Sequence, residues 1–472
     1  MPCRDWVIWV NCAGMWLSHP SRRAALRVVV AAVAVMAAGR VGMPGPPADV
    51  ARKAGLLVLE SRHLTLVTDR PPRAGDGVED LPRLFDEAFE AWCRHCGLDP
   101  ETHAGWRAFA CLMMDREPFH AAGLLPVDDG LPAFVNGFCA GSRFWMMDQS
   151  SPDYRRHLLL HEGVHAFMLT LRSAAAAPPW YAEGIAEYLA THRLDLDPSG
   201  APRFRATSIP ARRSDVEQLG RIEHLHTLRD SGRAPSLADV FALPPEAHRS
   251  LDAYAASWAA VALLSNHPAH RAVFTAAERG PLDRDFTARL TATAGWDDAR
   301  AGRDFASFLG DLDYGYDFSR SAIDWTPGAP LTARAEITVA ADRGWQNAGR
   351  SLTKGATCSF NAAGRVTVGR VSRPSDAGGD APEVHAAPEG ITLRWYRGRP
   401  VGRLLVAQWV EPDDGTPPSF RVLAEGAGGT FTAAVGGPVY LKVNESAGDL
   451  ADNAGAFGVT IEPDGSPLST AE

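Results

Sequence analysis

Residues 159–167 read Leu-Leu-His-Glu-Gly-Val-His-Ala-Phe, and this stretch decides how the middle of the chain is expected to fold. It lies within Tyr154–Leu171, which we predict to be one helix, with Pro152 near its start, where proline is favoured. Residues four apart lie on the same face of a helix, so His161 and His165 present two imidazoles to one point.

The residue types in this stretch suit a zinc ion. Zinc prefers nitrogen and carboxylate ligands in tetrahedral geometry, and a catalytic site leaves one position for water. Glu162 is turned partly around the helix, so it reaches that water rather than the metal and serves as general base. We therefore expect His161 and His165 to be zinc ligands and Glu162 to be catalytic. The alternative is a pair of histidines buried in a helical core.

A third zinc ligand is expected from a second helix. Pro178-Pro179 precedes Trp180–Thr191, which contains Glu183 and Glu187. Glu183 follows His165 by eighteen residues, enough for the first helix to end and for the chain to return antiparallel. Glu187 lies one turn further on the same face, where we expect it to orient a ligand histidine or the helix from the second coordination shell.

These segments resemble the gluzincin branch of zinc peptidases, and in particular the peptidase MA-like group of exported bacterial proteins. The motif around His161 and the later Trp180-Tyr181-Ala182-Glu183-Gly184 carry the resemblance. It implies a domain over residues 55–320, with an N-terminal antiparallel sheet and a helical zinc-binding part. It also favours Glu183 over Glu187 as the ligand.

The resemblance extends to one tyrosine. Tyr254, in Ala253–Ala260, is similar to the tyrosine of gluzincins that stabilises the oxyanion. The alternative is a buried helix tyrosine. The Gly-x-Met-Glu-Asn segment of the aminopeptidase group is absent from the sequence, so aminopeptidase activity is not expected.

Other titratable side chains receive simpler interpretations. His157 lies one turn before His161, and we expect it to be exposed or to cap the helix rather than to support the site. The cysteines are expected to be unpaired thiols, with a Cys111–Cys139 bridge as the alternative.

The N-terminal residues 1–45 are expected to be a secretory signal or an N-terminal anchor, followed by a linker. Arg22, Arg23 and Arg27 precede an apolar run over 28–38, which is the layout of an export signal. The run is shorter than a comfortable membrane span of about twenty residues. We therefore expect an exported protein without a multi-span membrane region.

The C-terminal residues 326–465 are predicted to form a separate β-sandwich or jelly roll. Gly, Pro and Thr increase after Thr326, and short alternating runs follow one another, as in Ile391–Tyr396 and Leu404–Val410. The whole chain is therefore expected to be α+β. Its net charge of −9 and the absence of basic patches interleaved with aromatics argue against nucleic acid as a partner.

An acidic segment of this C-terminal part suggests calcium. Glu445, Asp449, Asp452 and Asn453 crowd a turn between predicted strands, and oxygen ligands suit this hard cation. The alternative is a solvated acidic hairpin. The segment resembles the calcium-dependent galactophilic lectins of the PA-IL type, which implies these four residues as calcium ligands and a carbohydrate or cell-surface polymer as partner.

Three hypotheses follow from the sequence. The first is an exported zinc metallopeptidase that acts on a peptide or protein substrate. The second is a non-catalytic binding protein with a degenerate peptidase domain, against which the intact Glu162 argues. The third is a structural protein stabilised by metal.

Overall fold

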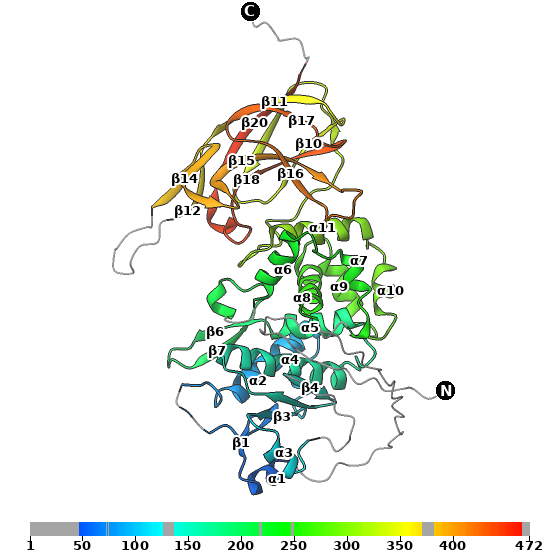
Figure 1. The fold of residues 1–472 in the computed structure, drawn as a ribbon, viewed down its shortest axis with the longest axis vertical. Coiled ribbons are helices and arrows are strands. Elements are labelled where there is room, and N and C mark those ends of the chain that lie inside the picture. Colours follow the sequence, from blue (N-terminus) through cyan, green and yellow to red (C-terminus); the bar gives the residue numbers. More distant parts are fainter. Residues whose placement is uncertain are drawn as a thin grey trace, which may run out of the picture.

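The computed structural model describes residues 47–464, apart from 72, 74, 126–135, 217–219, 247–249 and 371–381. The expected export segment, residues 1–45, lies outside the described residues. Three tiers follow one another along the chain (Figure 1): a sheet, a helical part, and a second group of strands. Helices and strands are both abundant, which confirms the α+β class.

The first tier is a five-stranded sheet with the order β1-β2-β3-β5-β4. Its strands are β1 (Leu57–Glu60), β2 (Leu64–Thr68), β3 (Ala108–Met113), β4 (Gly137–Ala140) and β5 (Arg143–Met147). The outer pairs are antiparallel, but β3 runs parallel to both of its neighbours. The expected antiparallel sheet was therefore wrong. Helix α2 (Leu81–Cys96) separates β2 from β3, and a crossover of this kind returns the chain in the same direction.

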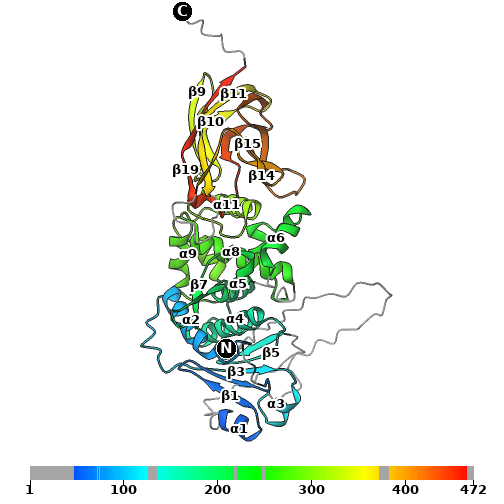
Figure 2. The ribbon, with the colours of Figure 1, turned by 90° about the vertical axis from the view of Figure 1, so that its left-hand side faces the viewer.

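Helices cover both faces of this sheet (Figure 2). Alternate strand residues such as Leu66, Ala110 and Phe144 pack against α2 and against α4 (Pro152–Leu171). The residues between them contribute to a second core, which also contains residues of α1 (Pro47–Lys53) and α3 (Glu117–Ala121). Helix α4 is thus held against the sheet along one side.

The five described cysteines are free thiols. The alternative of a Cys111–Cys139 bridge was wrong, because β5 lies between β3 and β4. In addition, Cys111 belongs to the core on one face of the sheet and Cys139 to the core on the other.

The second tier is helical and shares one core with α2 and α4. Its elements are α5 (Pro179–Ala190), the hairpin β6 (His192–Leu196) and β7 (Pro202–Ala206), η1 (Arg213–Val216), α6 (Arg221–Asp230), α7 (Leu237–Phe241), α8 (Leu251–Asn266), α9 (Arg271–Glu278), α10 (Phe286–Thr291) and α11 (Asp298–Asp311). Within the described part of the chain, no helix combines the length and apolarity that a bilayer span requires.

The third tier consists of β-strands around a core of its own. The larger sheet has the order β14-β15-β18-β10-β8, with β16 also paired to β15; a second sheet has the order β17-β11-β20-β9; and a third has the order β13-β12-β19. The strands are β8 (Ala329–Pro330), β9 (Ala335–Ala340), β10 (Gln346–Leu352), β11 (Thr357–Gly364), β12 (Val366–Arg370), β13 (Glu383–Ala386), β14 (Glu389–Tyr396), β15 (Arg399–Val410), β16 (Ser419–Glu425), β17 (Gly428–Thr432), β18 (Gly437–Val443), β19 (Asn453–Ala454) and β20 (Ala456–Pro463). Residues from both larger sheets, such as Val406 and Val459, meet in the shared core.

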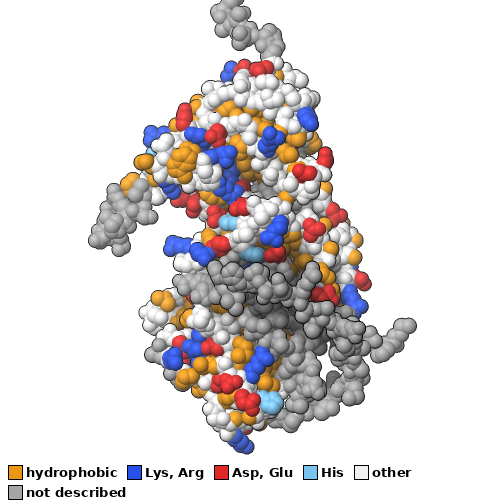
Figure 3. Space-filling model, viewed as in Figure 1, with side chains coloured by type: hydrophobic (Ala, Val, Ile, Leu, Met, Phe, Trp, Pro, Cys, Tyr) orange, Lys and Arg blue, Asp and Glu red, His pale blue; other side chains and the backbone are white. Residues whose placement is uncertain are grey.

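Buried polar contacts join the helical tier to the strands. Asp311, at the end of α11, accepts from Lys442 Nζ at 3.0 Å and from Arg397 Nη1 at 2.8 Å. Trp325 donates through Nε1 to Asp304 on α11 at 2.7 Å. Lys442 is buried, so its charge depends on Asp311 as partner. On the face shown in Figure 3, acidic and basic side chains are interspersed over all three tiers.

We predict that Gly448→Ala weakens this junction. A Cβ at residue 448 would overlap the backbone oxygen of Tyr314, so the two segments must separate. Overpacking of this kind costs about 1–3 kcal/mol, measured by urea unfolding. Gly458→Ala is the control, because its Cβ would meet no atom within 4 Å. Equal stability of the two variants would contradict the prediction.

Candidate metal centre

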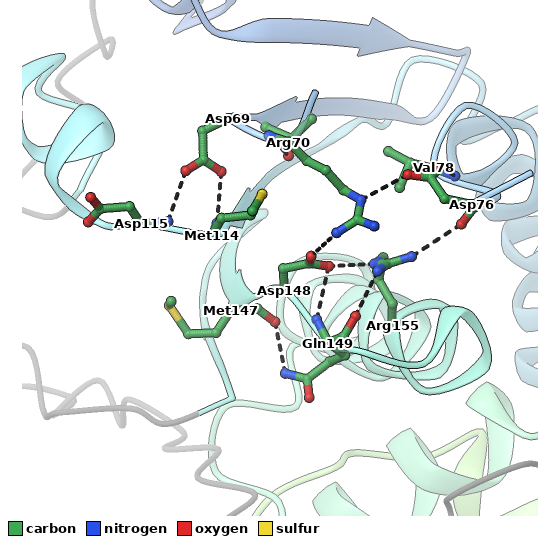
Figure 4. A network of polar contacts seen from close by, with 11 residues as sticks. Asp69, Arg70, Asp76, Val78, Met114, Asp115, Met147, Asp148, Gln149 and Arg155 are labelled. Atoms are coloured by element: carbon green, nitrogen blue, oxygen red, sulfur yellow. Dashed lines mark hydrogen bonds and ion pairs between the residues drawn. The ribbon is translucent and has the colours of Figure 1, made fainter. Parts of the chain in front are cut away.

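Helix α4 is anchored at its N-terminal end by a buried arginine. Arg155 donates to the backbone oxygen of Gln149 at 2.7 Å and pairs with Asp148, which follows β5 (Figure 4). Asp148 also pairs with Arg70, which in turn contacts Asp76 at 2.9 Å. Ser151 caps the helix by accepting from the backbone nitrogen of Tyr154. The start of α4 is therefore fixed to the end of the sheet.

Two turns further along, α4 brings His161 and His165 to one point. Their Nε2 atoms lie 3.1 Å apart. Glu183 Oε2, from α5, lies 3.6 Å from His161 Nε2 and 3.5 Å from His165 Nε2. We call these three residues the Glu183 trio. The structure thus unites the three expected zinc ligands.

The donor atoms of the Glu183 trio fit a tetrahedral ion. Two ligand atoms that each lie about 2.0 Å from zinc stand about 3.3 Å apart in tetrahedral geometry. The three observed separations, 3.1–3.6 Å, bracket this value. Glu183 Oε2 is buried and has no hydrogen-bond partner among the described residues, so a cation would satisfy an otherwise orphaned atom.

Close packing of α5 on α8 places Glu183. A Cβ at Gly184 would lie 2.5 Å from the backbone oxygen of Ser257, so only glycine permits this approach. The glycine that follows the glutamate therefore has a packing role. It allows α5 to lie between α4 and α8 with Glu183 facing the two histidines.

Glu187 lies behind His161, on the side away from Glu183 Oε2. Its Oε1 atom is 2.9 Å from His161 Nδ1. Its Oε2 atom is 3.0 Å from His157 Nε2 and also pairs with Arg221 Nη2. The expectation for His157 was wrong, because its side chain is buried and contacts Glu187. Helix α4 is buried on nearly all sides, so residue 157 has no exposed face to occupy.

Glu162 is fully buried, and both of its carboxylate oxygens lack a hydrogen-bond partner in the described structure. The carboxylate faces β4, where a Cβ at Gly137 would overlap Glu162 Oε1. The absence of a side chain at residue 137 therefore makes room for Glu162. Strand β4 is the last described strand on its side of the sheet.

Tyr254 on α8 reaches the same region. Its ring centroid is 6.1 Å from that of His161, with the ring planes tilted by 59°. The expected oxyanion residue therefore lies beside the expected metal ligands.

Burial and neighbouring charges shape the ionisation of the site. Burial raises the pKa of Glu162 to about 8. Burial also opposes ionisation of Glu183, but His165 and His161 outweigh it and lower the pKa of that carboxyl to about 2. The trio therefore offers an ionised carboxylate beside two imidazoles, which is a donor set suited to a divalent cation.

Sequence reasoning missed three features of this centre. Gly137 gave no signal, because a single glycine before a short strand has many explanations. Arg221, the first residue of α6, lies in no motif and meets Glu187 only in the folded chain. The partner of His157 was missed for the same reason, although its position one turn before His161 pointed to the correct face.

A further group of buried donors, His267, His270 and Asp304, lies near the junction. Asp304 accepts from Trp325 and contacts His270 Nε2 at 2.8 Å, while the backbone nitrogen of Ala269 donates to His267 Nδ1. These polar atoms already have protein partners, so we interpret the group as structural support.

The four expected calcium residues lie near one another around β19. Asn453 Nδ2 donates to Glu445 Oε2 at 3.1 Å, and Asn453 Oδ1 is buried without a described partner. Burial, with Asp449 and Asp452 nearby, raises the pKa of Glu445 to about 7. The three acids are not among the described groups whose donor atoms all lie within 4.8 Å of one another.

Comparison with known proteins adds little to this geometry. No family model and no curated protein matches the chain. A solved structure described as "EclA N-terminal domain; PllA-like lectin" resembles part of the chain at 18% identity. The match covers 28% of this chain and 98% of that one, with a TM-score of 0.19. A likeness of this size carries no argument about fold or function.

We predict that the Glu183 trio binds one zinc ion and that zinc raises the unfolding temperature. Zinc at a thousandfold excess over its Kd adds about 4 kcal/mol, which shifts the midpoint by on the order of 10 °C in a domain of this size. His165→Gln is expected to abolish the shift, because it removes one ligand. His120→Gln, at an exposed histidine, is expected to retain it. Equal shifts in both variants would place the ion elsewhere.

Proposed function

We propose that this protein is a zinc-dependent peptide hydrolase of the gluzincin type, exported from the cell. The observation that carries the proposal is the Glu183 trio with its donor atoms 3.1–3.6 Å apart, beside a buried Glu162 whose oxygens have no described partner. The gluzincin assignment rests on the sequence motifs, and the geometry of these residues is consistent with it.

His161, His165 and Glu183 would hold the ion, and Glu187 would keep His161 in orientation through Nδ1. A zinc ion held there supplies Lewis-acid polarisation of a substrate carbonyl. The proton transfers and the stabilisation of the oxyanion are carried out by side chains of the protein.

Glu162 accepts the proton of the attacking water at a carboxylate oxygen and passes it to the leaving amine. Both oxygens are available for this task, because no described protein group donates to them. Tyr254, whose ring lies near that of His161, donates its phenol hydrogen to the oxygen that becomes negative as the carbonyl is attacked.

A peptide substrate can approach along β4. This strand ends the described sheet on one side, and an extended peptide can pair with a strand edge through backbone hydrogen bonds. Gly137 on β4 lies against Glu162, so a peptide bound at this edge would pass next to the general base. The proposal therefore favours an enzyme that recognises the backbone of the peptide more than particular side chains.

The decisive experiment compares the wild-type protein with Glu162→Gln. We expect the wild type to cleave casein or a mixed peptide library, and the variant to lose at least about 10³-fold in kcat/KM, because it removes the base. Zinc content is expected to remain at one ion per chain. Glu90→Gln, on the exposed side of α2, is the matched control and is expected to be fully active.

Zinc binding without cleavage by wild type or variant would favour the alternative, a non-catalytic binding protein. Cleavage by Glu162→Gln at the wild-type rate would remove Glu162 from the mechanism.

For the C-terminal strands we propose a calcium site that involves Glu445 and Asn453, with Asp449 and Asp452 nearby. The supporting observation is the buried, unpartnered Asn453 Oδ1 beside a buried carboxylate. A carbohydrate or cell-surface polymer as ligand of this part remains a proposal from the sequence resemblance.

We predict that millimolar calcium raises the unfolding temperature of the wild type but not of Glu445→Gln. The substitution keeps the size of the side chain and removes the charge that a hard cation requires. Glu389→Gln, an exposed carboxylate on β14, serves as control and is expected to respond like the wild type. An unchanged midpoint in the wild type would indicate a solvated acidic hairpin.

A further inference from the structure

Two overlapping sets of donor atoms share His161. The Glu183 trio uses Nε2 of His161, whereas a second set, the Glu187 trio, consists of His157, His161 and Glu187. In each set the donor atoms all lie within 4.8 Å of one another. Both sets are buried, so distance and burial alone would allow either one to hold a metal ion.

The two carboxylates differ in their protein partners. Glu187 pairs with the guanidinium of Arg221 in addition to His157 and His161. Glu183 forms its ion pairs with the two ligand histidines, and no arginine or lysine of the described chain pairs with it. A guanidinium is charged at every relevant pH. A permanent charge of the protein therefore balances Glu187, whereas among the described residues no guanidinium or ammonium balances Glu183.

Arg221 is held in place by the start of a helix. It is the first residue of α6, directly after Gly220, whose φ of 52° turns the chain into the helix. Its side chain is 16% exposed, whereas Glu187 is only 1% exposed. Helix α6 packs on α8, and the guanidinium reaches Glu187 from there. The two oxygens of Glu187 therefore contact different partners: Oε2 pairs with Arg221, and Oε1 pairs with His161.

We propose that Arg221 is a positioning residue that assigns the metal to the Glu183 trio. By holding Oε2 of Glu187, it keeps Oε1 on His161 Nδ1 and leaves His161 Nε2 facing Glu183. Its guanidinium also provides the positive charge that a metal ion would otherwise provide at the Glu187 trio. This inference rests on the proposed metal centre but goes beyond it, because it predicts a single ion and names the residue responsible.

The test measures zinc affinity and stoichiometry by chelator competition and elemental analysis. We expect one zinc per wild-type chain. Arg221→Gln keeps hydrogen-bond donors but loses the charge, and we expect its zinc Kd to rise about 10- to 100-fold, as for other residues that orient metal ligands. Arg221→Lys restores the charge and is expected to stay within a few-fold of the wild type.

A double variant shows whether Arg221 acts through Glu187. If it does, Arg221→Gln combined with Glu187→Gln binds zinc no more than about twofold more weakly than Glu187→Gln alone. Arg229→Gln is the matched control on the same helix, because its side chain contacts Asp230 and the backbone of Gly310 instead. It is expected to leave zinc affinity unchanged.

The melting temperature of the metal-free proteins separates positioning from simple support. A lower melting temperature of Arg221→Gln with unchanged zinc Kd would overturn the proposal, as would two zinc ions per wild-type chain or additive losses in the double variant. If Arg221→Gln fails to fold, Arg221→Lys is compared with Glu187→Gln instead. The proposal then requires that Arg221→Lys bind zinc more tightly than Glu187→Gln. A wild type without zinc would overturn the metal centre itself, whereas equal zinc affinity in all variants would overturn only the role of Arg221.

Discussion

Helix α4 buries six ionisable side chains, and the rest of the structure depends on how these six are paired. A buried charge or imidazole is costly unless the protein supplies a partner. Five of the six have one: Arg155 pairs with Asp148, Arg156 with Asp153 and His192, His157 with Glu187, and the two ligand histidines with Glu183. Glu162 is the exception within the described structure, and it is the group to which we assign the chemistry.

Apart from Asp153, which lies on α4 itself, the partners come from other elements, and this explains the architecture around α4. Asp148 follows β5, His192 begins β6, and α5 supplies both glutamates. Arg221, at the start of α6, pairs in turn with Glu187 on α5. A sheet on one side and helices on the other are needed to bring these groups to a single helix. The sheet and the helical tier are therefore two halves of one site, which is consistent with the single core that they share.

The sequence allowed some of this centre to be predicted, for identifiable physical reasons. His161, His165 and Glu162 follow from helical periodicity, and Glu183 and Glu187 from a second periodic segment at suitable distance. Strand direction was misjudged because the antiparallel sheet was expected from the family resemblance, whereas the helix between β2 and β3 is the feature of a parallel crossover. His157 was misassigned because we expected the first part of this helix to be exposed, whereas α4 is buried from Arg155 through His165. Arg221 could not be found, since its contact with Glu187 depends on how α6 packs on α8.

The strand tier is connected to this arrangement by charge as well as by packing. Asp304 on α11 links His270 of the helical tier to Trp325, and the Trp325 ring packs among Trp409, Phe420 and Tyr440 of the strands. Asp311, at the end of the same helix, balances the buried Lys442. If one tier rotates against the other, Lys442 is left buried without Asp311 as its partner. Such a rotation therefore carries an electrostatic cost.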